Sequence, residues 1–282
     1  MDLLAGLQRS LRRALVRRGA KSSTRSLRGR AIHYYEVGSS GTGPPVLLVH
    51  GLGGSANGFY KILFPLGRRF RRVFAPDLPG HGFSAGEATT LEEGVELLSD
   101  FGEQVIGEPV FAVGNSLGGA LCLTLASERP ERVKALGLIA PAGARLAAEQ
   151  LAEISAALQV RNGAQARALT RRLFHRAPIV SLVFASLLPA FYGSASVRKV
   201  LANLDATAFI SPEALRRISV PTLLLWGKSE KLLPFEAVQY FRAHLPPKAE
   251  VEIVDGFGHV PQIERPRQLV QRLIAFADRA RL

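Results

Sequence analysis

The stretch that decides the fold is AVGNSLGGALC (Ala112–Cys122). A single serine, Ser116, stands two residues after Gly114 and two before Gly118, with an apolar run on one side and a helix-like run on the other. In a sharp turn from strand to helix, the central residue takes a strained backbone conformation, and its neighbours two positions away must be small. The stretch therefore predicts a buried strand, an exposed serine hydroxyl and a helix whose N-terminus points at that hydroxyl.

An incidental serine in a glycine turn is the alternative interpretation of this stretch. A G-x-S-x-G string arises by chance roughly 0.1–0.2 times in a chain of this length, so the string alone is moderately specific. The apolar run before it and the helical run after it supply the context that the chemistry needs. We therefore treat Ser116 as a candidate nucleophile.

Short apolar runs alternate with helix-period stretches along most of the chain. Runs of this kind suit strands that are buried on both faces of a parallel sheet. The predicted strands are 31–37, 46–50, 72–77, 109–114, 133–140, 221–227 and 249–255. The predicted helices are 59–69, 91–106, 117–128, 235–244 and 268–280. The alternation indicates an α/β fold with a mostly parallel central sheet and helices on both faces.

The alternation stops after Pro141. Residues 144–217 are helical in character, rich in Ala, Leu and Arg, and contain no strand-like run. We interpret this segment as a helical cap, or lid, inserted between two strands of one sheet. The predicted division is a basic N-terminal extension at 1–30, a core at 31–143 and 218–282, and the cap at 144–217.

The net charge of +13 is concentrated in the extension and the cap. Residues 1–30 hold nine Lys and Arg against one acid, and the cap holds ten against four. In the first 17 residues leucines recur at three- and four-residue spacing between arginines, which predicts a basic amphipathic helix able to lie on an anionic membrane. A frayed, solvated tail and an organelle transit peptide rich in Arg and Ser are the alternatives.

Composition excludes several classes of protein. With 47% apolar and 21% charged residues, the chain is neither largely disordered nor fibrous. Its one cysteine, Cys122, excludes an internal disulfide framework. The longest apolar-rich run, Ala177–Phe191, is shorter than the ~18–20 residues that a membrane-spanning helix needs. We expect a cytoplasmic protein, with peripheral contact to an anionic membrane through the extension and cap, and no nucleic-acid partner.

A serine hydroxyl becomes a good nucleophile only beside a base that a third group holds in place. The best candidate base is His259, in a glycine-flanked loop directly after the last predicted strand. We assign His50 and His81, in glycine-rich loops, to bracing those loops. The histidines without a motif are assigned to the surface or to packing: His33, His175 and His244.

The third group is expected to be a carboxylate after another late strand, and Glu230 in WGKSEKLLP (Trp226–Pro234) fits. An ionised carboxylate fixes the imidazole tautomer and stabilises the imidazolium. A solvated loop glutamate is the alternative. Asp255, which ends a strand beside the histidine loop, and Asp205, in the cap, are rival acids.

The oxyanion that develops during acyl transfer needs backbone N–H donors. The HGLGG loop (His50–Gly54) follows a predicted strand and can present the N–H of Leu52. Leu117, directly after the serine, can supply the second N–H.

Five motifs occur in one order along the chain: HGLGGSANGF, DLPGHGFS, GNSLGG, WGKSEKLLP and GHVPQIERP. Together they resemble the α/β-hydrolase fold superfamily, in its serine-hydrolase branch, from about residue 31 to the end. The resemblance implies a helical cap inserted after the sixth strand, Ser116 as nucleophile, His259 as base, and Leu52 and Leu117 as oxyanion donors. It implies an acid at the position of Glu230, where aspartate is usual. The serine argues against the haloalkane dehalogenase and epoxide hydrolase branches, which use an aspartate nucleophile.

The apolar part of the cap suggests the substrate. We hypothesise that this stretch lines an acyl pocket or faces lipid, although it can equally form the core of the cap itself. Its members are Ile179, Val180, Leu182, Val183, Phe184, Leu187, Leu188, Phe191 and Tyr192. We therefore predict hydrolysis of medium- or long-chain carboxylic esters, in the manner of a monoacylglycerol-lipase-like esterase, with no metal or organic cofactor.

Two other functions remain open. Carbon–carbon bond hydrolases of the meta-cleavage type carry a similar serine turn, and their acidic dienone substrates would suit basic cap residues. A non-catalytic, hydrolase-like binding protein is the second alternative, although the presence of a candidate serine, histidine and acid argues against it.

Overall fold

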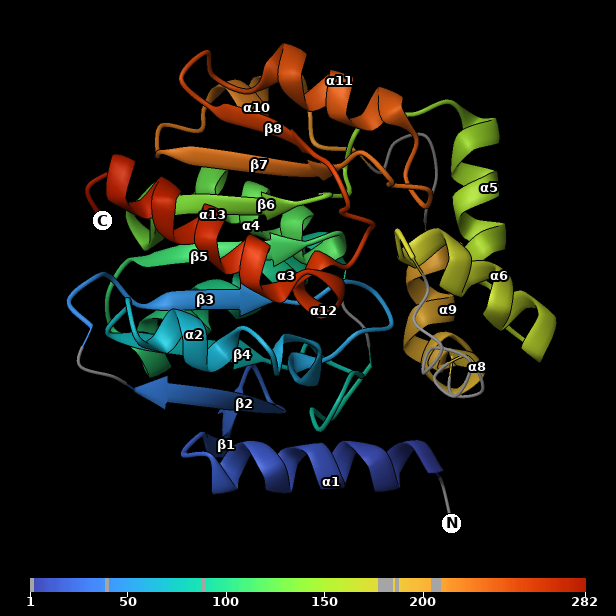
Figure 1. Ribbon diagram of the computed structural model, residues 1–282, viewed down its shortest axis with the longest axis horizontal. Helices are drawn as coiled ribbons and strands as arrows, with labels where there is room; N and C mark the ends of the chain where they lie inside the picture. Colours follow the sequence, from blue (N-terminus) through green and yellow to red (C-terminus); the bar gives the residue numbers. More distant parts are fainter. Residues whose placement is uncertain (1–2, 39–40, 88–89, 177–184, 186–187, 204–208) are drawn as a thin grey trace.

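The structure is a computed structural model that describes residues 3–38, 41–87, 90–176, 185, 188–203 and 209–282. An eight-stranded sheet lies at its centre, in the order β1-β2-β4-β3-β5-β6-β7-β8 (Figure 1). β1 and β2 run antiparallel to their neighbours, and the strands from β4 to β8 pair in parallel. The strands are β1 (Lys21–Leu27), β2 (Arg30–Gly38), β3 (Val46–Val49), β4 (Arg72–Pro76), β5 (Val110–Asn115), β6 (Val133–Ile139), β7 (Thr222–Gly227) and β8 (Glu250–Val254).

Helices cover both faces of the sheet, and two apolar clusters fill the spaces between. One cluster joins the sheet to α3, α4, α10 and α11, and the other joins it to α1, η1, α2 and α13. The core helices are α1 (Leu3–Arg17), η1 (Ala56–Phe59), α2 (Leu63–Gly67), α3 (Leu91–Phe101), η2 (Gly102–Ile106), α4 (Leu117–Glu128), η3 (Pro130–Arg132), α10 (Pro212–Arg216), α11 (Phe235–His244), α12 (Pro261–Glu264) and α13 (Pro266–Arg279). The predicted fold class is confirmed.

The central strands are apolar along almost their whole length because both of their faces are covered; the polar exceptions in β5 and β7 are Asn115 and Thr222. All six residues of β5 and all six of β7 are buried. Strands of this composition form parallel sheets flanked by helices, and in such sheets the carboxyl ends of the strands meet at one edge. The turn at Ser116 follows β5 and therefore lies at this edge.

The cap lies beyond the carboxyl ends of the parallel strands (Figure 1). The chain enters it after β6 and returns to the sheet at β7. Its described helices are α5 (Ala148–Leu158), α6 (Gly163–Leu173), α8 (Leu188–Tyr192) and α9 (Ala195–Ala202). Several cap residues on which the sequence analysis rests lie outside the described residues: Ile179, Val180, Leu182, Val183, Phe184, Leu187 and Asp205.

The basic segment 1–30 forms a helix and a strand. α1 packs on the fold through Leu15, which is buried, and the Arg18 guanidinium lies 4.4 Å from the centre of the Phe64 ring. β1 then pairs antiparallel with β2 at the edge of the sheet, from Lys21 opposite Glu36 onward. The sheet thus begins inside the range that the sequence analysis assigned to the extension. This strand was not predicted, because the polar run Lys21–Leu27 has no apolar strand pattern. No helix in the described ranges is both long and apolar enough to cross a membrane.

Candidate active site

Ser116 occupies the turn between β5 and α4, and its backbone is strained. Its φ of +54° and ψ of −119° lie outside the regions that side chains with a Cβ prefer. Its N–H donates to Ile139 O at a distance of 3.0 Å, and its carbonyl oxygen accepts from the amides of Ala120 and Ala142. These hydrogen bonds hold the turn in place while Ser116 stays partly exposed.

The two flanking glycines are required by close backbone contacts. A Cβ on Gly114 would lie 2.2 Å from Gly118 O, and a Cβ on Gly118 would lie 2.1 Å from Val49 O. Either contact is far inside van der Waals distance, so only glycine fits. The second contact also brings the first turn of α4 against the end of β3, where the HGLGG loop begins.

His259 and Glu230 are hydrogen-bonded to each other. The imidazole Nδ1 lies 2.8 Å from Glu230 Oε2, and the two side chains are only 4% and 1% exposed. Because a carboxylate only accepts, the proton of this bond sits on Nδ1. The other ring nitrogen, Nε2, is therefore free to accept a proton. This tautomer is the one that a general base for a serine hydroxyl requires.

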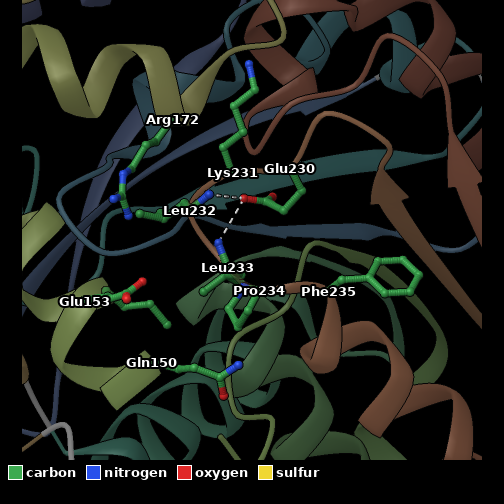
Figure 2. A pocket seen from close by; sticks show the side chains of 10 residues that line it. Gln150, Glu153, Arg172, Glu230, Lys231, Leu232, Leu233, Pro234 and Phe235 are labelled. Carbon is green, nitrogen blue, oxygen red and sulfur yellow. Dashed lines mark hydrogen bonds between the residues drawn. The ribbon is translucent and has the colours of Figure 1, made fainter. Parts of the chain in front are cut away.

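The backbone of its own loop holds the Glu230 carboxylate. Oε1 accepts from the amide of Leu232 at 2.7 Å and from that of Leu233 at 3.1 Å (Figure 2). A pocket of about 210 Å³ lies between this loop and the cap helices α5 and α6, with Glu153 and Arg172 projecting from the cap side. One carboxylate oxygen is thus fixed by two N–H groups, which leaves the other aimed at the imidazole.

Asn115 connects the serine turn to the histidine loop. Its side-chain NH₂ donates to Ile139 O at 3.0 Å and to His259 O at 2.9 Å. Its Oδ1 accepts from Gln262 Nε2 at 2.9 Å. Among the described residues, the Ser116 hydroxyl and the His259 ring share no hydrogen bond. The serine turn and the histidine loop are connected through the buried side chain of Asn115. Sequence analysis missed Asn115 and Gln262, because neither has a spacing that signals the contact.

The HGLGG loop lies beside Ser116. A Cβ on Gly51 would lie 3.1 Å from the Cβ of Ser116. In the described part of the chain, the amides of Leu52 and Leu117 donate no hydrogen bond. Leu117 follows the serine directly and Leu52 follows Gly51, so their amides stay the candidate donors to an anionic oxygen formed at Ser116.

His50 and His81 brace this loop as neutral side chains. His50 Nε2 accepts from the amide of Leu78 at 3.0 Å, and His81 Nε2 accepts from that of Gly53 at 3.3 Å. A protonated imidazole cannot accept, so these contacts need the neutral form. Burial lowers the pKa of His50 to about 4 and also lowers that of His81. The bracing role predicted for these two histidines fits this geometry.

His33 is a packing residue, one of the two roles assigned to it, and the rival acid Asp255 lies outside the site. His33 is buried, with Nδ1 2.8 Å from Asp77 Oδ2 and Nε2 2.8 Å from Ser22 Oγ, so it joins β1 to the loop after β4. Asp255 is exposed and has no hydrogen-bond partner among the described residues. No group of three or more His, Cys, Asp or Glu side chains is arranged for a metal ion in the described ranges.

Comparison with known proteins identifies the family. The model of the family described as "Alpha/beta hydrolase family" matches residues 46–272. The chain belongs to this family. This hydrolase is 33% identical over 88% of its length to the dihydrolipoyllysine-residue acetyltransferase component of the acetoin cleaving system of Pseudomonas putida, covering 67% of that protein.

Two further similar proteins have names that denote different reactions. The hydrolase is 30% identical to a 2-hydroxy-6-oxo-6-(2'-aminophenyl)hexa-2,4-dienoic acid hydrolase of Metapseudomonas resinovorans, over 85% of this chain and 86% of that one. The solved structure of a membrane phospholipase A, described as a bacterial virulence factor, superposes with a TM-score of 0.84 at 28% identity. That match covers 99% of this chain and 91% of the other.

Proposed function

We propose that this hydrolase cleaves carboxylic esters with medium or long acyl chains through an acyl-enzyme on Ser116. The observation that carries the proposal is the Glu230–His259 hydrogen bond, which selects the imidazole tautomer with an unprotonated Nε2. The loop that carries His259 is hydrogen-bonded to the serine turn through Asn115. An oriented base next to a strained, partly exposed serine is the arrangement that nucleophilic acyl transfer uses.

The reaction follows from the roles of these groups. The Ser116 oxygen attacks the ester carbonyl while His259 Nε2 takes its proton, and Glu230 stabilises the imidazolium through Nδ1–H. The amides of Leu52 and Leu117 bind the oxyanion. His259 then protonates the leaving alcohol, and a water molecule repeats the sequence on the acyl-enzyme.

A cavity in the cap supports an acyl substrate. It has a volume of about 550 Å³ and is lined by the apolar side chains of Val160, Tyr192 and Leu201 together with Arg161 and Arg198. A cavity of this size and character suits a hydrocarbon chain.

Tyr192 lies between this cavity and the HGLGG loop. A Cβ on Gly53 would lie 2.9 Å from its ring, so the ring packs directly on the loop. Tyr192 therefore separates the cavity from the loop that borders Ser116.

The acyl-chain proposal is tested by filling the cavity. Ala202, exposed at its edge, is replaced by Trp, and the neighbouring exposed Asn203, which does not line the cavity, by Trp as a control. Burial of one methylene contributes about 0.8 kcal/mol, or roughly fourfold in kcat/KM. With p-nitrophenyl esters of increasing length, Ala202→Trp lowers kcat/KM only for chains long enough to enter the cavity. Equal losses for acetate and dodecanoate esters would refute the assignment.

Carbon–carbon bond hydrolysis is the second candidate, favoured by the Metapseudomonas relative and by the two arginines at the cap cavity. Parallel assays with p-nitrophenyl esters and a ring-cleavage dienone separate the two, because the substrate with the higher kcat/KM identifies the reaction. Ser116→Ala is expected to abolish either activity while the protein stays folded. Absence of labelling by a fluorophosphonate probe that labels a control esterase would favour a non-catalytic binding protein.

We also propose that the enzyme binds an anionic membrane surface and takes its ester substrate from there. Because Leu15 and the partly buried Leu11 hold α1 on the fold, the outward side of the helix carries Arg9, Arg13 and Arg17, spaced four residues apart and exposed. None of these three arginines has a carboxylate partner among the described residues. Arginines near an anionic bilayer contribute about 1 kcal/mol each.

Vesicle sedimentation tests the membrane proposal. The triple variant Arg9→Gln, Arg13→Gln, Arg17→Gln is expected to bind phosphatidylserine-containing vesicles on the order of 100-fold more weakly. The control replaces three exposed arginines on other elements with Gln: Arg242, Arg267 and Arg281. Equal binding of the wild type to neutral and anionic vesicles would refute an electrostatic mode.

A further inference from the structure

One short segment of the cap contacts the loop that carries His259. The amide of His259 donates to Leu173 O at 2.9 Å, at the end of α6. The preceding residue, Gly258, leaves room for the same segment, since a Cβ there would lie 2.6 Å from His175 N and 2.7 Å from Leu173 O. The histidine loop and the cap are thus joined backbone to backbone, without side chains between them.

The carboxylate of Glu264, the last residue of α12, accepts hydrogen bonds from both sides of this junction. Its Oε1 accepts from the amide of Arg176 at 2.8 Å. Its Oε2 accepts from the amides of His175 at 3.1 Å and Gly258 at 3.2 Å. One carboxylate therefore binds two N–H groups of the cap and one of the histidine loop. Hydrogen bonds to an ionised acceptor are roughly twice as strong as neutral ones, so the junction depends on this charge.

The same cap segment also reaches the loop of the paired acid. His175 Nδ1 lies 2.6 Å from Ser229 Oγ, and the amide of Ser229 donates to Phe257 O at 3.1 Å. Ser229 directly precedes Glu230. Residues 173–176 therefore contact both loops whose side chains form the hydrogen-bonded pair, while the nearby pocket of about 210 Å³ separates α5 and α6 from the rest of the Glu230 loop (Figure 2).

We infer that Glu264 is a positioning residue that couples the docking of the cap to the placement of His259. The inference rests on the proposed function, in which the imidazole must meet the Ser116 hydroxyl. While the cap is docked, Glu264 and Leu173 O bind the two backbone amides that directly precede the imidazole-bearing Cα, those of Gly258 and His259. When the cap moves away, the amide of His259 loses Leu173 O, and Glu264 loses the amides of His175 and Arg176. The carboxylate that binds the amide of Gly258 is then held less firmly, and so is the base. A displacement of about 1 Å at a reacting group can cost on the order of 100-fold in rate.

Two substitutions at Glu264 give a graded test. Glu264→Ala removes all three acceptor contacts. Glu264→Gln keeps one acceptor oxygen, which can serve the amides of His175 and Gly258 while that of Arg176 is lost. The control is Glu131→Ala, since Glu131 is an exposed glutamate without a partner in the described ranges. Hydrogen exchange is followed in peptides spanning 173–176 and 256–260, together with kcat, KM and the rate of fluorophosphonate labelling per folded protein.

The expected result is a joint change. Glu264→Ala speeds hydrogen exchange in both peptides by the same factor. It also lowers kcat and the labelling rate by 10- to 100-fold, with KM nearly unchanged. Glu264→Gln gives a smaller effect in each readout, and Glu131→Ala gives none. Faster exchange in the cap peptide alone, or an unchanged labelling rate of the folded protein, overturns the inference. If Glu264→Ala does not fold, the wild type and Glu264→Gln decide, because uncoupled exchange of the two peptides contradicts a shared junction. A wild type inert to every ester and to the probe refutes the proposed function, whereas the exchange data still judge the coupling.

Discussion

Replacing Glu230 with Gln keeps the size of the side chain and changes only which atoms donate. In the wild type, Oε1 accepts two amides at 2.7 and 3.1 Å, and Oε2 accepts from His259 Nδ1 at 2.8 Å. Glutamine has one oxygen and one NH₂, so it cannot fill both roles. Two orientations are available, and the structure indicates which one is preferred.

If the glutamine oxygen faces the imidazole, its NH₂ faces the amides of Leu232 and Leu233. Two buried N–H groups then lose their acceptor, at about 1–3 kcal/mol each. The opposite orientation keeps both amide bonds and turns the NH₂ toward Nδ1 of His259. It is favoured by about 2 kcal/mol or more, a factor of roughly 30. Nδ1 must then accept, the ring proton moves to Nε2, and the imidazole can no longer take a proton from Ser116.

The expected loss in kcat is therefore about 10⁴-fold, or about 5.5 kcal/mol, the scale found when an orienting acid of this kind becomes an amide. Single-turnover hydrolysis of a p-nitrophenyl ester measures it, and thermal unfolding establishes that the variant is folded. The matched control is Asp255→Asn, at an exposed carboxylate without a partner among the described residues. If Glu230→Gln kept more than a tenth of the wild-type kcat, the tautomer argument would be wrong.

Two further outcomes follow from backbone fit and from burial. Gly118→Ala places a Cβ 2.1 Å from Val49 O and is expected to lower the free energy of unfolding by at least about 3 kcal/mol, measured as a lower Tm. The control is Gly102→Ala, which has open space around its Cβ and is expected to leave the Tm unchanged or higher. Because burial lowers the pKa of His50 to about 4, the unfolded chain binds one more proton than the folded one between about pH 6.5 and 4. That group then lowers stability by about 1.4 kcal/mol for each unit that the pH falls. His50→Gln, which keeps an acceptor but does not titrate, should flatten urea-unfolding stability across this range; an unchanged slope would contradict the assignment.

The sequence predicts the part of the fold that is set by local rules. Gly114 and Gly118 mark the turn because their backbone contacts exclude a Cβ at both positions. The apolar strands can be predicted because burial on both faces leaves few polar positions. β1 could not be predicted, since Lys21–Leu27 lies at the edge of the sheet, where a polar strand is tolerated.

The contacts that assemble the site come from residues distant in sequence. Asn115 meets His259 across 144 positions, and Glu264 meets His175 across 89. Both residues stand in the quoted motifs GNSLGG and GHVPQIERP, but the motifs do not reveal these contacts. The partner atoms are backbone amides and carbonyls, which every residue carries. Sequence patterns report side-chain chemistry and periodicity, so they give the hydroxyl, the base and the acid as candidates but not the groups that hold them.

The strain at Ser116 explains why so many of these holding contacts gather around one turn. A non-glycine residue at a φ of +54° costs on the order of 1–3 kcal/mol and persists only where its surroundings fix it from several sides. The N–H of Ser116 is bonded to the end of β6, its carbonyl oxygen accepts two amides, and the Asn115 side chain binds both the end of β6 and the histidine loop. One bond beside the strained turn, from the Asn115 side chain to His259 O, also connects the turn to the histidine loop. Relaxing the turn would move Asn115 as well, so the strained backbone and the position of the histidine loop share this interaction.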